Sequence, residues 1–387
     1  MKNYTEECLQ ESIKLLKENS NKFGVLASAP TKTAEARNYL SIFGRDASIC
    51  AMGMVVSGDK SLKMSARHSL ETLAKYQADN GQIAFWVKPE KKQTDFYYLG
   101  CIDSTLWWLI AIKFYDQNIG ENLSKKLAKK IKLAINWLEC QEHPKIYLLQ
   151  QNETSDWADL MPRSGFVLYS NALWYWVKKL YKLKNIDKTK EYFNYILDDN
   201  IKLPAKAIKE NSHLKTLKSF VKADKKNPTY LSFVNHSYAG YEVDVFGNIL
   251  ACLVGLADDK KAKQIIKYFR DKKANQPWPI KTVLNPIKKS DKLWKAYMNK
   301  HNVINRPQQY HNGAIWPFIG GFWVMLLSIS DEKIAHSELL RLADLNKRGN
   351  WQFREWFNGQ SGRPAGMPRQ SWNAATYILA YKNIKNI

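Results

Sequence analysis

DWADLMPRSG, residues 156–165, runs directly into FVLYSNALWYWVKKLY, residues 166–181, and this pair of segments decides the fold. The first segment is a loop that holds two carboxylates three residues apart together with a Trp, an Arg and a Gly. The second is apolar or aromatic nearly all round at helical spacing, which predicts a helix buried on every side. A polar loop followed by a buried helix is the unit that the rest of the chain repeats.

Apolar periodicity near 3.6 residues predicts about twelve helices. They alternate in character, because every second helix is apolar nearly all round and the others carry one Lys-rich polar face. Amphipathic helices cover buried ones, so the alternation predicts six inner helices inside six outer helices, an all-α (α/α)6 barrel. The predicted helices span residues 4–19, 46–57, 61–78, 103–117, 122–139, 166–182, 186–198, 243–257, 259–272, 314–329, 331–345 and 371–383.

The length suggests one large domain or two ordinary ones, and 45% hydrophobic residues suffice for a buried core. The barrel pattern predicts a single domain over residues 1–387. Two segments, 199–241 and 273–310, are long and less periodic. We interpret them as loop excursions from the barrel. Loops of that length in a compact domain are usually functional, so one of them is expected to cover or flank the barrel mouth.

The loops ahead of the six inner helices are rich in Gly, Asp, Trp, His or Arg. Inner helices of such a barrel run parallel, so these loops are expected to converge on one mouth. Helix caps would also place Gly, Asn and Asp there, but they do not explain the Trp and His, which are absent from loops before outer helices. The six loops are FGRD (43–46), YLGCID (98–103), DWADLMPRSG (156–165), NHSYAGYEVD (235–244), QYHNGAIWP (309–317) and FREWFNGQSGRPAGMPRQSW (353–372).

The formal net charge of +23 comes mostly from lysines that are spread along the helices rather than gathered in one basic arm. This pattern favours a solvated surface over a nucleic-acid site, so no nucleic-acid partner is expected. No apolar run reaches the ~18 residues of a membrane-spanning helix, and the N-terminus lacks the apolar core of a signal peptide. We therefore predict a cytoplasmic protein without a membrane partner.

The composition of the predicted mouth fits a carbohydrate site, because aromatic faces stack on sugar rings while carboxylates and guanidinium groups take the hydroxyls. Glycosidic hydrolysis needs two carboxyl groups, one as acid and the other as base or nucleophile. Taken singly, each carboxylate is better explained as a helix cap or an ion-pair partner. The candidates are Asp46, Asp103, Asp156, Asp159, Glu242, Asp244 and Glu355.

Other chemistries lack their motifs. The sequence contains no GxSxG, no HExxH, no P-loop and no GxGxxG after a strand. His236 and His311 lie in different loops without the spacing of a metal motif. We therefore expect no metal and no organic cofactor.

With these motifs in view, the chain resembles two groups of (α/α)6-barrel glycosidases from about Asn38 to Tyr381. These are the catalytic domain of the glycogen-debranching amylo-α-1,6-glucosidases and the neutral/alkaline invertases. FGRD resembles their WGRD segment, IDSTLWW (102–108) their VDATLWF or VDSGLWW, and QYHNGAIWPFIGGFW the YHNGxxWP block of both groups. DWADLMPRSGFVLYSNALWYW is similar to the debranching TWMD…TPRSGKPVEINALWYNAL. GNWQFREWFNGQSGRPAGMPRQSW resembles the invertase WPEYYDxxSGRxxGKQxRxxQTW and the debranching SEIFDG.

The resemblance implies that Asp159 is the general acid and Glu355 the general base of an inverting glycoside hydrolase. The preferred substrate is an α-glucosidic bond in an oligosaccharide, as in the amylo-α-1,6-glucosidases, and sucrose is the alternative. A phosphorylase and a non-catalytic carbohydrate-binding protein are further alternatives, and the oligomeric state is left open. The residues expected to bind the substrate are Arg45, Asp46, Asp103, Trp107, Trp157, Arg163, Tyr310, His311, Trp316, Arg369 and Trp372.

Overall fold

The computed structural model describes residues 4–96, 101–219, 221–222, 224, 226–299 and 305–385. Residues 98–100 of the predicted YLGCID loop lie outside this description, as do 220, 223, 225 and 300–304 of the two predicted excursions. The chain forms two compact units. The first comprises Met1–Trp137, Gln276–Ile280 and Ala314–Ile387, and the second Leu138–Asn275 and Lys281–Gly313. The assignment of a single domain stays a prediction.

All twelve predicted helices are present. The helix predicted at 122–139 is divided at Leu127, and α15 continues beyond its predicted end through a kink at Arg348–Asn350. The main helices are α1 (Tyr4–Glu18), α3 (Gly44–Val56), α4 (Lys60–Lys75), α5 (Ile102–Ile119), α6 (Leu123–Lys126), α7 (Ala128–Glu139), α8 (Leu168–Tyr181), α9 (Ile186–Leu197), α12 (Val245–Leu253), α13 (Asp259–Asp271), α14 (Pro317–Ser328), α15 (Glu332–Trp351) and α16 (Ser371–Lys385). Short helices α2 (Lys32–Ala36), α10 (Ala205–Glu210), α11 (His213–Ser219), η1 (Pro89–Lys91) and η2 (Ala296–Asn299) lie in the connections.

The predicted alternation of buried and amphipathic helices is confirmed. Helices α3, α5, α8, α12, α14 and α16 are buried over most of their length, on all sides. By contrast, α13 buries only Ile265, Ile266 and Phe269 and exposes most of its lysines. A helix with one apolar stripe is stable only against a neighbour that covers the stripe. The chain therefore builds helical pairs, each with a buried and an exposed member.

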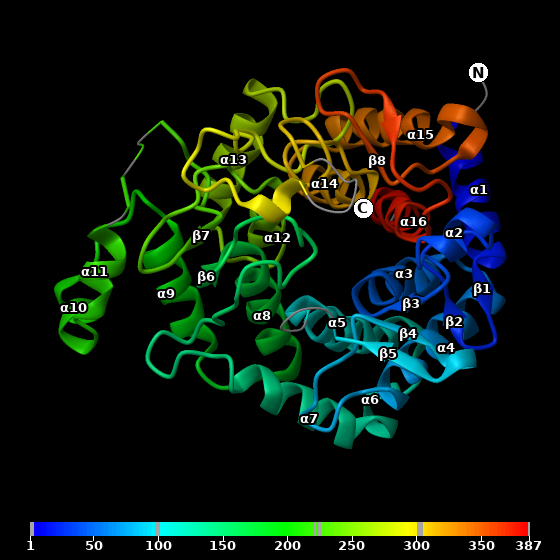
Figure 1. The fold of residues 1–387 in the computed structure, drawn as a ribbon, viewed down its shortest axis with the longest axis horizontal. Helices are drawn as coiled ribbons and strands as arrows, with labels where there is room; N and C mark the ends of the chain where they lie inside the picture. The colour runs from blue at the N-terminus through cyan, green and yellow to red at the C-terminus, as the bar shows by residue number, and fades with distance from the viewer. Residues whose placement is uncertain are drawn as a thin grey trace. The chain divides into compact units, whose positions relative to one another are not determined.

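In the first unit, α3 packs against α5 and α16, and α16 packs against α14 and α1 (Figure 1). Glycines make the closest of these approaches possible. A Cβ added at Gly53 of α3 would lie 2.2 Å from the carbonyl oxygen of Ala375 in α16, and one at Gly321 of α14 would lie 2.6 Å from that of Thr376. Both sites therefore require glycine for the helices to pack this closely.

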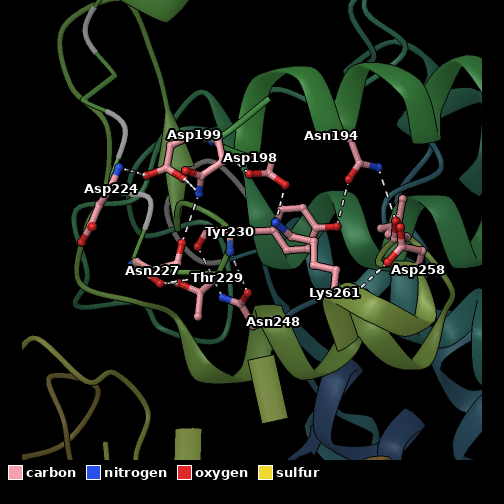
Figure 2. A network of polar contacts seen from close by, with 12 residues as sticks. Asn194, Asp198, Asp199, Asp224, Asn227, Thr229, Tyr230, Asn248, Asp258 and Lys261 are labelled. Carbon is pink, nitrogen blue, oxygen red and sulfur yellow. Dashed lines mark hydrogen bonds and ion pairs between the residues drawn. The ribbon is translucent and has the colours of Figure 1, made fainter. Parts of the chain in front are cut away.

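In the second unit, α8 packs against α12, and α9 packs against α8. A polar network ties α9 to α13 (Figure 2). Lys261 of α13 forms an ion pair with Asp198 at the end of α9, and its ammonium lies 4.4 Å from the ring centroid of Tyr230. The Tyr230 hydroxyl donates to Asn194 Oδ1 of α9 at 2.9 Å. These charges are paired within the protein, so the network joins helices rather than presenting a site.

Four small antiparallel sheets lie in the loops. β1 (Ser20–Asn21) pairs with β2 (Gly24–Val25), and β3 (Ile42–Phe43), β4 (Trp86–Lys88) and β5 (Gln93–Asp95) form one sheet in that order. β6 (Phe166–Val167) pairs with β7 (Phe233–Val234), and β8 (Trp356–Phe357) pairs with β9 (Pro364–Ala365). β3 and β6 each end where an inner helix begins. The sheets therefore hold the polar loops at the N-terminal ends of the inner helices.

Within the described ranges, no helix combines the length and the apolar character that crossing a membrane requires.

Candidate active site

Glu355 lies in the first unit, on a hairpin formed by β8 and β9. Its amide donates to Met367 O at 2.9 Å, and the amide of Met367 donates to Glu355 Oε2 at the same distance. The hydroxyl of Tyr39 donates to the other carboxylate oxygen, Oε1, at 2.6 Å. Gly366 lies against this carboxylate with φ of +67°, and a Cβ there would lie 2.5 Å from Oε2. The side chain is therefore fixed at both oxygens and crowded from one side.

The environment of Glu355 makes it a stronger base than an exposed carboxylate. The residue is only 6% exposed. Burial raises its pKa, the hydrogen bonds from Tyr39 and Met367 oppose the rise, and the nearby negative charge of Asp46 adds to it. A carboxylate whose pKa is shifted toward neutrality accepts a proton from water more readily.

The backbone that leads into this hairpin is strained. Asn350, Trp351 and Phe353 have φ values of +64°, +58° and +42°, and Arg369 on the returning arm has +59°. Side chains other than glycine rarely adopt such angles, and the strain is tolerated where the surrounding structure enforces it. The segments on both sides of Glu355 thus adopt backbone angles that their own residue types do not favour.

Arg45, Asp46 and Asp103 meet at the first turns of α3 and α5, as predicted from the FGRD and IDST segments. Arg45 Nη2 lies 3.1 Å from Asp46 Oδ2, and its Nη1 lies 3.3 Å from Asp103 Oδ2. All three are buried, Asp103 completely. Burial raises the pKa of Asp46, and the adjacent guanidinium opposes that rise. The guanidinium also lies 5.7 Å from the ring centroid of Trp372, which links this cluster to α16.

The tryptophans predicted to contact sugar differ in their surroundings. Trp372 stacks on Phe318 with centroids 4.1 Å apart and meets Trp316 edge-on at 5.6 Å. Trp107 is completely buried, with its ring 5.7 Å from that of Phe322 in α14. The structure thus places Trp316 and Trp372 in one aromatic group and Trp107 in the helix core.

Asp159 lies in the second unit, in loop 156–165, the third of the six polar loops. Its Oδ1 is 3.6 Å from His311 Nδ1, and its side chain is 24% exposed. Trp157 meets the His311 ring edge-on at 5.1 Å, and the Tyr310 ring lies 4.0 Å from the same imidazole. Four of the predicted site residues, from two loops far apart in the chain, are therefore neighbours.

Asp156, the other acid of this loop, is 2% exposed. Its Oδ1 accepts from the Ala158 amide at 2.8 Å and its Oδ2 from Gln151 Nε2 at 3.0 Å. Both oxygens are thus used inside the protein, which leaves Asp159 as the accessible carboxylate of the pair.

Arg163 and Arg369 each form an ion pair with another residue. Arg163 is 1% exposed and pairs with Asp244 through Nη1 at 3.1 Å. Arg369 forms an ion pair with Glu18 at the end of α1, with both side chains partly exposed. Arg163 thus lies in a buried charge cluster, and the Arg369 side chain is directed toward the N-terminal helix.

Sequence reasoning missed Tyr39. The residue lies in a loop before β3 without a recognisable motif, and its contact with Glu355 spans 316 positions of the chain.

In the part of the chain that the structure describes, no three His, Cys, Asp or Glu side chains are grouped so as to hold a metal ion.

Comparisons with known proteins agree with this description. The family model of the alkaline and neutral invertases matches residues 168–386, more than half of the chain. The matched segment includes Tyr310, His311, Glu355 and Trp372 but begins after Asp159. No curated protein sequence matches the chain.

Solved structures share its fold. The GH63 mannosylglycerate hydrolase of Thermus thermophilus, in complex with Tris and D-glycerate, superposes with a TM-score of 0.66 at 12% identity over 97% of this chain and 100% of that one. A glycosidase in complex with glucose gives 0.65 at 12% identity over 99% and 97%. A bacterial glucoamylase complexed with acarbose gives 0.57 at 15% identity over 99% of this chain and 56% of that one. The predicted (α/α)6-barrel class is therefore confirmed.

Proposed function

Because this chain belongs to the alkaline and neutral invertase family of glycoside hydrolases, we propose that it hydrolyses the glycosidic bond of sucrose with inversion at the glucosyl carbon. Glu355 carries the proposal. It is a buried carboxylate inside the matched segment, fixed at Oε1 by Tyr39 and at Oε2 by Met367. Among the described residues it makes no ion pair, so no cation within contact distance holds it ionised.

In the proposed reaction, Asp159 protonates the glycosidic oxygen and Glu355 takes a proton from the attacking water. The water oxygen bonds to the anomeric carbon, the bond to the leaving oxygen breaks, and glucose and fructose are released. The partial exposure of Asp159 and its neighbour His311 support its role as acid. Arg45, Asp46, Asp103, Trp372 and Trp316 are proposed to hold the glucosyl ring. The charge of Asp46 acts on Glu355, and the Arg45 guanidinium joins Asp46, Asp103 and the Trp372 ring in one group.

One experiment tests both the substrate and the stereochemistry. Purified protein is incubated with sucrose, and proton NMR follows the first glucose released. Inversion at an α-glucosyl carbon yields β-glucose before mutarotation, whereas initial α-glucose would refute the inverting mechanism. Release that requires phosphate and yields a sugar phosphate would identify a phosphorylase, and binding without release a carbohydrate-binding protein.

Two isosteric variants test the residues. Asp159→Asn and Glu355→Gln are each expected to lower kcat by about 1,000-fold or more, because each removes a proton-transfer group. Asp156→Asn is the matched control, since it lies in the same loop and both its oxygens bond within the protein. It is expected to lower the free energy of unfolding and to keep kcat within about tenfold. Near-normal kcat in Asp159→Asn would remove Asp159 from the mechanism.

A second candidate substrate is an α-glucosidic bond in a glucan-derived oligosaccharide. The segment 156–176 favours it, because this segment resembles the debranching enzymes and its first twelve residues precede the family match. A panel of sucrose, trehalose, isomaltose, panose and a branched limit dextrin separates the two. Faster release from isomaltose or panose than from sucrose would favour the oligosaccharide.

A further inference from the structure

A cluster of three buried charges in the second unit has no part in the reaction described so far. Arg163, Glu242 and Asp244 are each at most 3% exposed. Arg163 Nη1 donates to Asp244 Oδ2 at 3.1 Å, whereas its Nε lies 3.6 Å from Glu242 Oε1, too far for a hydrogen bond. The guanidinium therefore donates a hydrogen bond to only one of the two carboxylates.

The cluster leaves several polar atoms without hydrogen bonds. Within the described part of the chain, no partner is found for Arg163 Nε and Nη2, for either oxygen of Glu242 or for Asp244 Oδ1. Folded proteins rarely bury such atoms unsatisfied, because each costs its full desolvation penalty. Five of them around one guanidinium indicate that the cluster is complete only when a polar molecule occupies it.

The charge balance shows which chemistry would complete it. Two carboxylates face one guanidinium, and Asp156 adds a further nearby negative charge. Burial raises the pKa of Asp244 to about 6, with the charge of Arg163 opposing the rise. A cluster with surplus carboxylate repels anions and attracts hydrogen-bond donors. Hydroxyl groups fit, since each can donate to a carboxylate and accept from the guanidinium.

A series of contacts connects this cluster to the proposed general acid. Arg163 follows Asp159 by four residues in the same loop. The Val245 amide, next to Asp244, donates to Thr282 O at 3.0 Å, and Thr282 Oγ1 donates to His311 O at 2.8 Å. His311 in turn contacts Asp159. The segment around Thr282 therefore joins the buried cluster to the acid.

We propose that Glu242, Asp244 and Arg163 bind the hydroxyl groups of the leaving sugar. The inference rests on the proposed function, in which Asp159 protonates the leaving oxygen and the groups around Glu355 hold the glucosyl ring. For sucrose the leaving sugar is fructose. Glu242 is the decisive residue, because neither of its oxygens has a hydrogen bond within the described structure.

The test compares product inhibition by fructose and by glucose. Glu242→Gln keeps the size of the side chain and removes the charge. It is expected to raise the inhibition constant of fructose by about 10- to 100-fold, the loss of one hydrogen bond to a charged group, while that of glucose stays within twofold. The matched control is Glu338→Gln, a buried glutamate whose oxygens accept from Arg341 and Trp323. The control is expected to change neither constant.

Equal weakening of both sugars, or no change in either, would show a purely structural cluster filled by water and would overturn the proposal. Selective weakening of glucose would overturn the assignment to the leaving sugar. If Glu242→Gln does not fold, Arg163→Lys is tested in the same way. This substitution keeps the positive charge but removes the guanidinium nitrogens that lack hydrogen bonds. If wild-type protein releases nothing from sucrose, the proposed function fails. Calorimetric titration of fructose and glucose into wild type and variants then tests the cluster separately.

Discussion

Replacing Tyr39 by Phe tests whether the hydroxyl tunes the basicity of Glu355. The substitution removes one oxygen, which donates to Glu355 Oε1 at 2.6 Å, and leaves the ring in place. It leaves the Met367 amide bond to Oε2 intact. The carboxylate therefore keeps one of its two hydrogen bonds and stays on the same hairpin.

The sign of the effect follows from the ionised form. Burial already raises the pKa of Glu355, and the Tyr39 hydroxyl opposes that rise because it stabilises the carboxylate. Removing the hydroxyl therefore raises the pKa further. A hydrogen bond to a charged group contributes about 1.5–3 kcal/mol, which corresponds to roughly one to two pH units at 1.36 kcal/mol per unit.

The assay is the pH dependence of kcat/KM with sucrose. A general base acts only when deprotonated, so the acidic limb of the wild-type profile reports the pKa of Glu355 in the unbound enzyme. We expect this limb to move up by about one to two pH units in Tyr39→Phe. The basic limb should stay in place.

A matched control separates this effect from the loss of any tyrosine hydroxyl. The Tyr195 hydroxyl donates to Glu191 Oε1 at 2.9 Å within α9, among surface charges. Tyr195→Phe is expected to leave both limbs unchanged. An acidic limb in Tyr39→Phe that coincides with that of wild type would refute the reasoning, whatever happens to kcat.

Three further substitutions test the site and the fold. Gly366→Ala places a Cβ 2.5 Å from Glu355 Oε2 and is expected to lower kcat by about 100-fold, because the base is displaced; an unchanged kcat would show that the hairpin yields freely. Lys261→Met leaves the buried Asp198 without its ion-pair partner and is expected to lower the free energy of unfolding in urea by about 3 kcal/mol without changing KM. Asp244 has a folded pKa of about 6, above the ordinary 3.8, so its protonation stabilises the fold fully below pH 4, and this stabilisation is lost as pH rises through 6. Relative to Asp244→Asn, the free energy of unfolding of the wild type is expected to fall by about 3 kcal/mol between pH 4 and 7. Parallel stability curves for the two proteins would contradict this.

The helices could be predicted because their signal is local. A stretch of about fifteen residues is enough to show whether a helix is apolar on all sides or along one stripe. This pattern predicted the starts of α3, α5 and α8 within two residues of those observed. The extension of α15 beyond residue 345 was not predicted, and it contains positive φ at Gly349 and Asn350, which apolar periodicity does not indicate. Such angles follow from tertiary contacts rather than from local preference.

Some of the contacts among the candidate site residues could be predicted from residue type and position. The FGRD and IDST segments each lie at the start of a buried helix, and Arg45, Asp46 and Asp103 of these segments contact one another. Composition could not distinguish Trp107, which fills the core beside Phe322, from Trp372, which lies over Arg45. Both lie in buried helices and both contact a ring of α14, so their residue type and periodicity are alike.

The electrostatic surroundings of the buried acids divide them into two kinds of role. Asp103 lies 3.3 Å from the Arg45 guanidinium, so a cation compensates its charge. Glu355 is equally deep but is held by a neutral hydroxyl and an amide, which orient the carboxylate and compensate its burial only in part. Its affinity for a proton is therefore raised while its position is fixed. A general base needs both properties, and Glu355 combines them.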